Sequence, residues 1–148
     1  MPVIRKVTVG IAAGLAAIAS ALVPMSSAGA ATTDTTNSKC AVKSPWGVKG
    51  YKLCNSDPYK HGYVDWDSNG TTDEVFVIAP DYTIWHTWKA AGRWVEMPGK
   101  GRADGIEGHN GSNTTRERCI VVTVSWKDYP YYQNCFYSGK WHSWRTAG

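Results

Sequence analysis

The nine residues from Asp65 to Asp73 carry the side chains that a hard cation selects. Oxygen-bearing side chains stand at positions one, three, five and nine of this run, and a glycine stands at position six. Ca²⁺ takes roughly six to eight oxygen ligands, and glycine can adopt the backbone conformation that a tight turn requires. We therefore expect a structural calcium site, completed by water, with these ligands: Asp65, Asp67, Asn69, the backbone carbonyl of Thr71, and Asp73.

The run from Asp65 to Asp73 allows two other interpretations. An EF-hand needs a glutamate at its twelfth position, but Phe76 stands there and a strand-like segment follows. An EF-hand is therefore excluded. A solvated turn rich in aspartate and asparagine, without a metal, remains the alternative to a calcium site. In either case we expect the run to hold a loop in place and to catalyse no reaction.

The stretch from Tyr63 to Ile78 resembles the calcium loop of FG-GAP/VCBS propeller repeats, known from integrin α-subunits and many bacterial secreted proteins. In those repeats the pattern D-x-D-x-[DN]-G-x-x-D leads into an apolar strand. Two residues depart from it: Ser68 stands where glycine is common, and Glu74 stands where an apolar residue usually begins the strand. The resemblance implies a β-propeller blade with a structural calcium ion.

The chain has more aromatic side chains than a core of its size needs, with 8 Trp and 8 Tyr. The segment from Thr83 to Trp88, followed by Gly92 to Trp94, resembles blades of bacterial β-propeller lectins, which stack sugars on Trp or Tyr. The resemblance implies a set of ligand-binding residues: Trp85, His86, Trp88 and Trp94. On a strand, Trp85 and Thr87 would share one face, and His86 and Trp88 the other. Aromatic packing in a small β core is the alternative.

Short apolar or aromatic stretches alternate with clusters of Gly, Asn, Asp and Pro from Trp46 onward. β-branched and aromatic residues dominate these stretches, and none shows a helical period over three turns. The sequence therefore predicts an all-β protein, with strands near residues 48–53, 74–79, 83–88, 93–97, 119–124, 131–136 and 141–144.

An internal similarity without gaps recurs at an offset of 47 residues. Val75 to Val77 aligns with Val122 to Val124, and Gly92 to Trp94 with Gly139 to Trp141. We expect two blade-like antiparallel units, about 46–99 and 100–148, within one all-β domain. They would form a compact sandwich, or a partial β-propeller that protomers close into a ring as a homo-oligomer. Chance similarity between two ordinary β-meanders is the alternative.

Four cysteines predict two disulfides, and their spacing favours Cys40–Cys54 and Cys119–Cys135. In a hairpin centred on Lys127, Cys119 faces Cys135 directly, as a non-hydrogen-bonded pair allows. A zinc site or a reactive thiol is disfavoured because the chain has no CxxC and no Cys/His cluster.

Residues 1–30 have the layout of a secretory signal peptide, with a basic head, a short apolar middle and a small-residue exit. An uncleaved anchor is the alternative. Residues 31–45 are expected to be flexible. Cleavage would keep all 12 acidic residues and remove two of the 16 basic ones, and so weak an excess of charge argues against nucleic acid as partner. We expect a secreted, extracellular protein with no membrane partner after cleavage.

No common catalytic motif is present, and the four histidines are scattered. We therefore expect a non-enzymatic binding module, lectin-like, for an extracellular glycan or cell-wall polysaccharide. Two alternatives stay open. One is a secreted inhibitor of an extracellular protease or glycosidase, with the glycine-rich stretch 98–111 as its reactive loop. The other is a structural protein of the cell wall.

Overall fold

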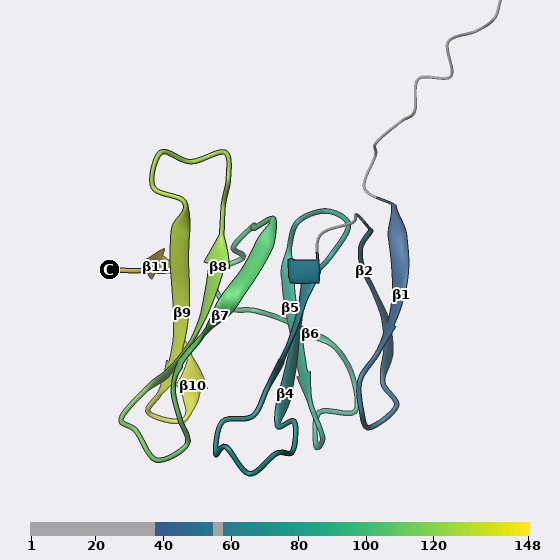
Figure 1. Ribbon diagram of the computed structural model, residues 1–148, viewed down its shortest axis with the longest axis vertical. Helices are drawn as coiled ribbons and strands as arrows, with labels where there is room; N and C mark the ends of the chain where they lie inside the picture. The colour runs from purple at the N-terminus through teal and green to yellow at the C-terminus, as the bar shows by residue number, and fades with distance from the viewer. Residues whose placement is uncertain (1–37, 55–57) are drawn as a thin grey trace, which may run out of the picture. The chain divides into compact units, whose positions relative to one another are not determined.

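A computed structural model describes residues 38–54 and 58–148, and it is all-β (Figure 1). The one helical element is a 3-10 turn, η1, at Pro58–Lys60. The predicted signal peptide, residues 1–30, and the first seven residues of the predicted flexible segment, 31–37, lie outside the described residues. Within the described part of the chain, no helix is long and apolar enough to cross a membrane.

The strands form three antiparallel sheets. A hairpin pairs β1 with β2, and a middle sheet has the order β3-β4-β5-β6. A five-stranded sheet has the order β10-β9-β8-β7, with β11 also paired to β9. The bounds are β1 Lys39–Lys43, β2 Lys49–Leu53, β3 His61–Val64, β4 Glu74–Ile78, β5 Ile84–Trp88, β6 Val95–Glu96, β7 Gly105–Gly111, β8 Arg118–Thr123, β9 Tyr131–Tyr137, β10 Lys140–Trp141 and β11 Arg145–Thr146.

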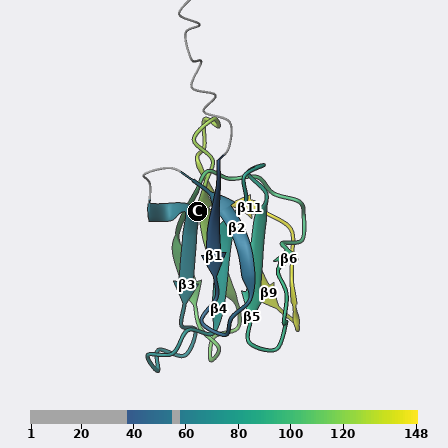
Figure 2. The same cartoon turned by 90° about the vertical axis from the view of Figure 1, so that its right-hand side faces the viewer.

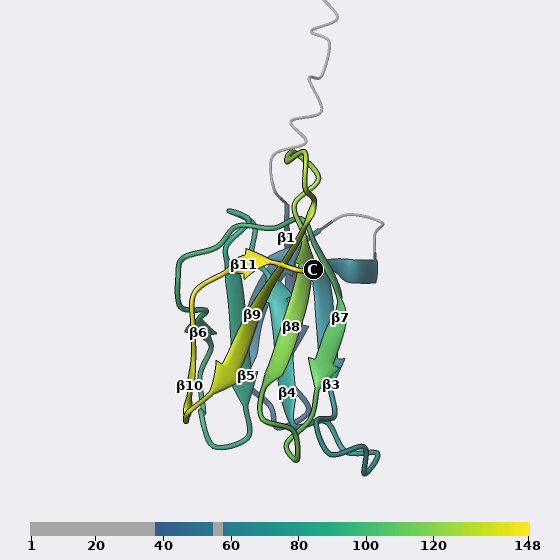
Figure 3. The ribbon, with the colours of Figure 1, turned by 90° about the vertical axis from the view of Figure 1, so that its left-hand side faces the viewer.

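The middle sheet is covered on both faces. Figure 2 shows the β1–β2 hairpin over one face, and Figure 3 shows the five-stranded sheet over the other. All five residues of β4 are buried. Because side chains alternate along a strand, Phe76 and Ile78 point towards the five-stranded sheet, while Val77 faces the hairpin. A strand without a solvent face explains the continuous apolar run in its sequence.

The main core lies between the two larger sheets. Phe76, Ile78 and Ile84 of the middle sheet pack in one cluster with Ile120 and Val122 of β8. These side chains are almost completely buried. Burial of apolar surface stabilises by about 25 cal/mol per Å², so this cluster helps to hold the two sheets together.

Both predicted disulfides are present and confirm the pairing. Cys119 and Cys135 are register partners in β8 and β9, with Cα atoms 4.0 Å apart. Cys40 and Cys54 close the β1–β2 hairpin, with Cα atoms 5.1 Å apart. The predicted turn is confirmed as well, because the Val124 N–H donates to the carbonyl of Pro130.

Four strands lie where none was predicted. One is β11, which follows the predicted strand 141–144, of which only Trp141 is in a strand, β10. β1 falls within the segment 31–45 that was expected to be flexible, so the domain begins before residue 46. β3 precedes the acidic run. β7 falls within the glycine-rich stretch 98–111, most of whose second half is paired with β8. The predicted boundary between the two units, at residues 99 and 100, lies in the connection between the two larger sheets. The middle sheet ends at Glu96, and the five-stranded sheet begins at Gly105.

Candidate functional site

A cleft opens at one end of the interface between the two larger sheets. Its volume is about 590 Å³. We call it the inter-sheet cleft. Both sheets and the acidic run contribute to its lining, which is Trp66, Asp73, Glu74, His86, Trp88, Val95, Glu96, Pro98, Asn113, Arg118, Phe136, Gly139, Lys140 and Trp141.

A buried glutamate lies at the base of the inter-sheet cleft. The carboxylate of Glu74 is 2.5 Å from the Nδ1 atom of His86, which lies diagonally across on β5, two residues before Trp88, the register partner of Glu74. Its other oxygen accepts a hydrogen bond of 2.9 Å from the indole N–H of Trp66. All three residues are buried, at 3% exposure or less. A carboxylate can occupy such a position only when it is paired and hydrogen-bonded.

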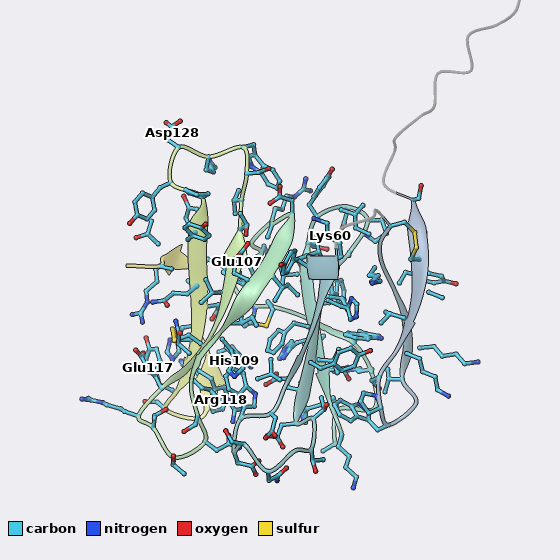
Figure 4. The ribbon with its side chains drawn as sticks, viewed as in Figure 1. Lys60, Glu107, His109, Glu117, Arg118 and Asp128 are labelled. Carbon is cyan, nitrogen blue, oxygen red and sulfur yellow. A yellow bond between two sulfur atoms is a disulfide. The ribbon has the colours of Figure 1, made fainter. Side chains whose placement is uncertain are left out.

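Arg118 brings a positive charge to the same place from β8. Its guanidinium lies 3.9 Å from the Glu74 carboxylate. The guanidinium carbon also lies over two rings, 4.4 Å from the centroid of Phe136 and 5.2 Å from that of Trp66. Figure 4 shows Arg118 near the end of the domain where β8 begins. The stacked rings and the carboxylate fix the orientation of the guanidinium.

The rim of the inter-sheet cleft is more open. Trp88, at the end of β5, is 38% exposed, and its ring is tilted over His86 at a centroid distance of 5.2 Å. Glu96 and Lys140 contribute an acceptor and a donor from the two sheets. An exposed indole face above a fixed polar base can hold a ligand that has both an apolar face and hydroxyl groups.

The structure divides the four predicted ligand residues between two places. His86 and Trp88 line the inter-sheet cleft, whereas Trp85 and Trp94 line a second cavity of about 380 Å³ on the opposite face of the middle sheet. The strand alternation expected from the sequence accounts for this division. Trp94 lies directly on the β1–β2 hairpin, where a Cβ added to Gly50 would be 2.3 Å from the indole nitrogen.

The acidic run forms a compact loop between β3 and β4. One oxygen each from Asp65, Asp67 and Asp73 lies within 4.8 Å of the others. The loop is held by its own backbone, because Asp65 accepts N–H bonds from Gly70 and Asn69, and Asp73 accepts one from Trp66. Such a cluster of carboxylates can hold a cation.

The other two predicted ligands, Asn69 and Thr71, are held by hydrogen bonds within the loop. The Asn69 side chain donates to Asp67 and accepts the N–H of Thr71. The position of Thr71 is thereby fixed by a side chain of the loop itself. The loop also adjoins the inter-sheet cleft, because Asp73 lines that cleft.

Interactions within the loop shift the pKa values of Asp67 and Asp65 in opposite directions. The pKa of Asp67 is raised, first by a shared hydrogen bond with Asp65, then by desolvation and by the charge of Asp73. Desolvation acts to raise the pKa of Asp65 too, but the N–H donor of Gly70, the shared hydrogen bond with Asp67 and the N–H donor of Asn69 together outweigh it and lower that pKa. A bound cation would relieve the repulsion that raises the pKa of Asp67.

Several residues of the inter-sheet cleft were not predicted from the sequence. The sequence pattern marks Glu74 only as a departure from the calcium loop, and it indicates no role in a site for Arg118, Phe136 or Trp141. A single charged residue at the head of the otherwise apolar run Glu74–Ile78 was the available signal, because such a residue needs a buried partner. Arg118 comes from another sheet, and no local pattern links the two.

The stretch 98–111, which we considered as a reactive loop, does not form one continuous exposed loop. Ala103 and Ile106 are in the core, and the isolated bridge between Thr83 and Arg102 holds the connection against the middle sheet. From Gly105 onward the chain is strand β7. β7 is the edge strand of the five-stranded sheet, so its backbone is paired with β8 along one side.

The chain was also compared with protein-family models, curated proteins and solved structures. None of the three comparisons found a match. The resemblances to FG-GAP/VCBS repeats and to propeller lectins therefore stay predictions that rest on the quoted motifs.

Proposed function

We propose that this chain is a secreted, non-enzymatic carbohydrate-binding module that holds a sugar in the inter-sheet cleft. The observation that carries the proposal is the half-exposed Trp88 beside a fixed polar base formed by Glu74, His86 and Arg118. The volume of about 590 Å³ falls within the range of roughly 300–1,000 Å³ that is usual for ligand sites. The natural partner would be an extracellular glycan or a cell-wall polysaccharide.

The chemistry of a pyranose matches the two parts of the inter-sheet cleft. One face of a sugar ring is apolar and can lie on an indole, while its hydroxyl groups need both donors and acceptors. Glu96 supplies an acceptor, and Lys140 supplies a donor. Glu74 is already engaged by Trp66 and His86, which suits a supporting role better than catalysis.

Calcium would have a structural role in this proposal. The loop of Asp65, Asp67 and Asp73 leads directly into Glu74 and also borders the inter-sheet cleft. A cation held there would fix the start of β4 and so the position of Glu74. The two disulfides support export to an oxidising compartment, because disulfides persist mainly outside the cytosol.

The test is binding of immobilised polysaccharides and a glycan array, with the wild type and two tryptophan variants. Trp88→Ala should lower affinity about thirtyfold, the equivalent of ~2 kcal/mol for an aromatic at the centre of a site. Trp85→Ala is the matched control, since it removes the same side chain from the opposite face of β5. Circular dichroism would show that both variants fold.

Three outcomes would count against this function. Absence of binding to every glycan would overturn it. Loss of binding in Trp85→Ala with retention in Trp88→Ala would place the sugar in the other cavity and refute the inter-sheet cleft as the site. Hydrolysis of a bound glycan would refute the non-enzymatic part.

A further inference from the structure

A third cavity lies at the other end of the five-stranded sheet, and it is basic. Its volume is about 420 Å³. We call it the basic pocket. It is formed by three cationic and three aromatic residues around Val122 and Val124: Lys100, Arg102, Lys127, Trp126, Tyr132 and Trp144. β8 runs from Arg118 in the inter-sheet cleft to Val122 in this pocket, four residues on, a distance of about 13 Å at ~3.3 Å per residue. The two sites are therefore separate.

The three cations of the basic pocket are available to a ligand. All three are exposed. No ion pair joins Lys100, Arg102 or Lys127 to a carboxylate of the described residues. Asp81 is the carboxylate that interacts with Arg102, and this interaction is weak. The pKa of Asp81 is lowered mainly by the Thr83 hydroxyl and only to a smaller extent by the charge of Arg102. The pocket thus keeps an excess of positive charge.

The conformation of Lys100 also points to a role for its charge. It has a φ of 47°, between Gly99 and Gly101. A left-handed conformation costs a residue with a side chain about 1–2 kcal/mol, and glycine or asparagine adopts it more readily. A lysine at this turn does not help the backbone, so what it contributes is the ammonium group.

The aromatic residues give the basic pocket flat apolar surfaces. Trp126 is 51% exposed and packs edge-on against Tyr82 at 5.5 Å. Trp144 lies so close to the chain at Gly101 that an added Cβ would be 2.4 Å from its indole nitrogen. The Trp144 ring is therefore held in place by the backbone of the same turn that carries Lys100. Rigid rings beside free cations suit a ligand with apolar ring faces and negative charges.

We propose that the basic pocket binds the anionic group of an acidic polysaccharide, a carboxylate or a sulfate, with a sugar ring on Trp126. The inference rests on the proposed function in taking the ligand to be a saccharide, but it concerns a different site. It selects acidic over neutral glycans, which the inter-sheet cleft alone would not do.

The experiment measures affinity by calorimetry for polygalacturonate, for heparin and for a neutral polymer, dextran. Lys100→Asn and Lys127→Gln are combined in one variant, because asparagine tolerates the left-handed conformation and keeps the turn. The matched control is Lys43→Gln with Lys49→Gln, which removes the same charge from exposed register partners of the β1–β2 hairpin. We expect about tenfold weaker binding of at least one acidic polymer in the first variant only, and weaker binding at high salt.

The results separate this inference from the proposed function. Equal affinity for acidic and neutral polymers, or equal losses of affinity in the two lysine variants, would overturn the basic pocket as an anion site. Weaker binding in Trp88→Ala would still support the inter-sheet cleft as the sugar site. Acidic binding that is lost in the Lys100 and Lys127 variant but unchanged in Trp88→Ala would support the basic pocket and refute the cleft. A single-stranded oligonucleotide that binds more tightly than both acidic polymers would show that the ligand is not a saccharide.

Discussion

Removal of the Glu74 carboxylate should be the most damaging single change at the inter-sheet cleft. Glu74→Ala leaves the Trp66 indole N–H without its acceptor at 2.9 Å, and it leaves His86 without its partner at 2.5 Å. It also removes the carboxylate nearest to Arg118. Loss of one partner from a buried ionic cluster costs about 3–5 kcal/mol, a large part of the ~5–15 kcal/mol that stabilises a typical domain.

The matched control is Glu117→Ala in the same domain. Glu117 pairs with Arg145 at 3.3 Å, but the two side chains are 47% and 52% exposed. Exposed pairs contribute about 0–1 kcal/mol because water and salt screen them. The two glutamates thus differ mainly in burial, and the expected costs differ about fourfold.

The assay is urea unfolding at neutral pH, followed by far-ultraviolet circular dichroism. With a slope of about 2 kcal/mol/M, a loss of ~4 kcal/mol lowers the midpoint by about 2 M. If Glu74→Ala does not fold, Glu74→Gln keeps an acceptor for Trp66 and should cost about 1–3 kcal/mol. A midpoint for Glu74→Ala equal to that of Glu117→Ala would refute the buried cluster as a stabilising element.

Three further predictions concern other parts of the molecule. Calcium at about a hundred times its dissociation constant should stabilise the fold by ~2.7 kcal/mol. Asp67→Asn should lose this response, whereas Asp128→Asn, at the β8–β9 hairpin tip (Figure 4), should keep it. A melting temperature of the wild type that chelator does not change would exclude the ion. Burial, and then the charge of Lys52, lowers the pKa of His61 in the folded protein below its ordinary value of 6.5. Its contribution to stability is therefore fully present above pH 6.5 and is lost as pH falls from there through the lower folded-state pKa. His61→Gln should flatten this part of the pH profile of the urea midpoint, and an unchanged profile would contradict the burial. Gly50→Ala should cost about 1–3 kcal/mol because its Cβ would lie 2.3 Å from the Trp94 indole nitrogen; an equal cost in a Trp94→Ala background would show that the clash is not the cause.

The parts of the fold that the sequence predicted best are held together by local contacts. The β8–β9 hairpin was placed correctly because the turn residues and the spacing of Cys119 and Cys135 specify the same register. β7 was not predicted because three of its seven residues are glycine and few are apolar. β1 was missed for a related reason: Val42 is its one buried residue, and the disulfide and its pairing with β2 hold it in place.

The candidate site was only partly predictable. The face alternation of β5 divided His86 from Trp85 correctly, because the two-residue period of a strand is a local property. The partners of Glu74 were not predictable, because Arg118 comes from another sheet. A departure from a sequence motif was therefore the clue to a buried charge, although by itself it could not identify the cation beside it.

The double-sided burial of β4 also bears on how the molecule comes together. Glu74–Ile78 packs against a sheet on either side, so a shift of one residue would drive the Glu74 carboxylate into the position of an apolar neighbour. Both outer layers pack on this strand. An error in the alignment of the central strand would therefore disturb the packing of both flanks.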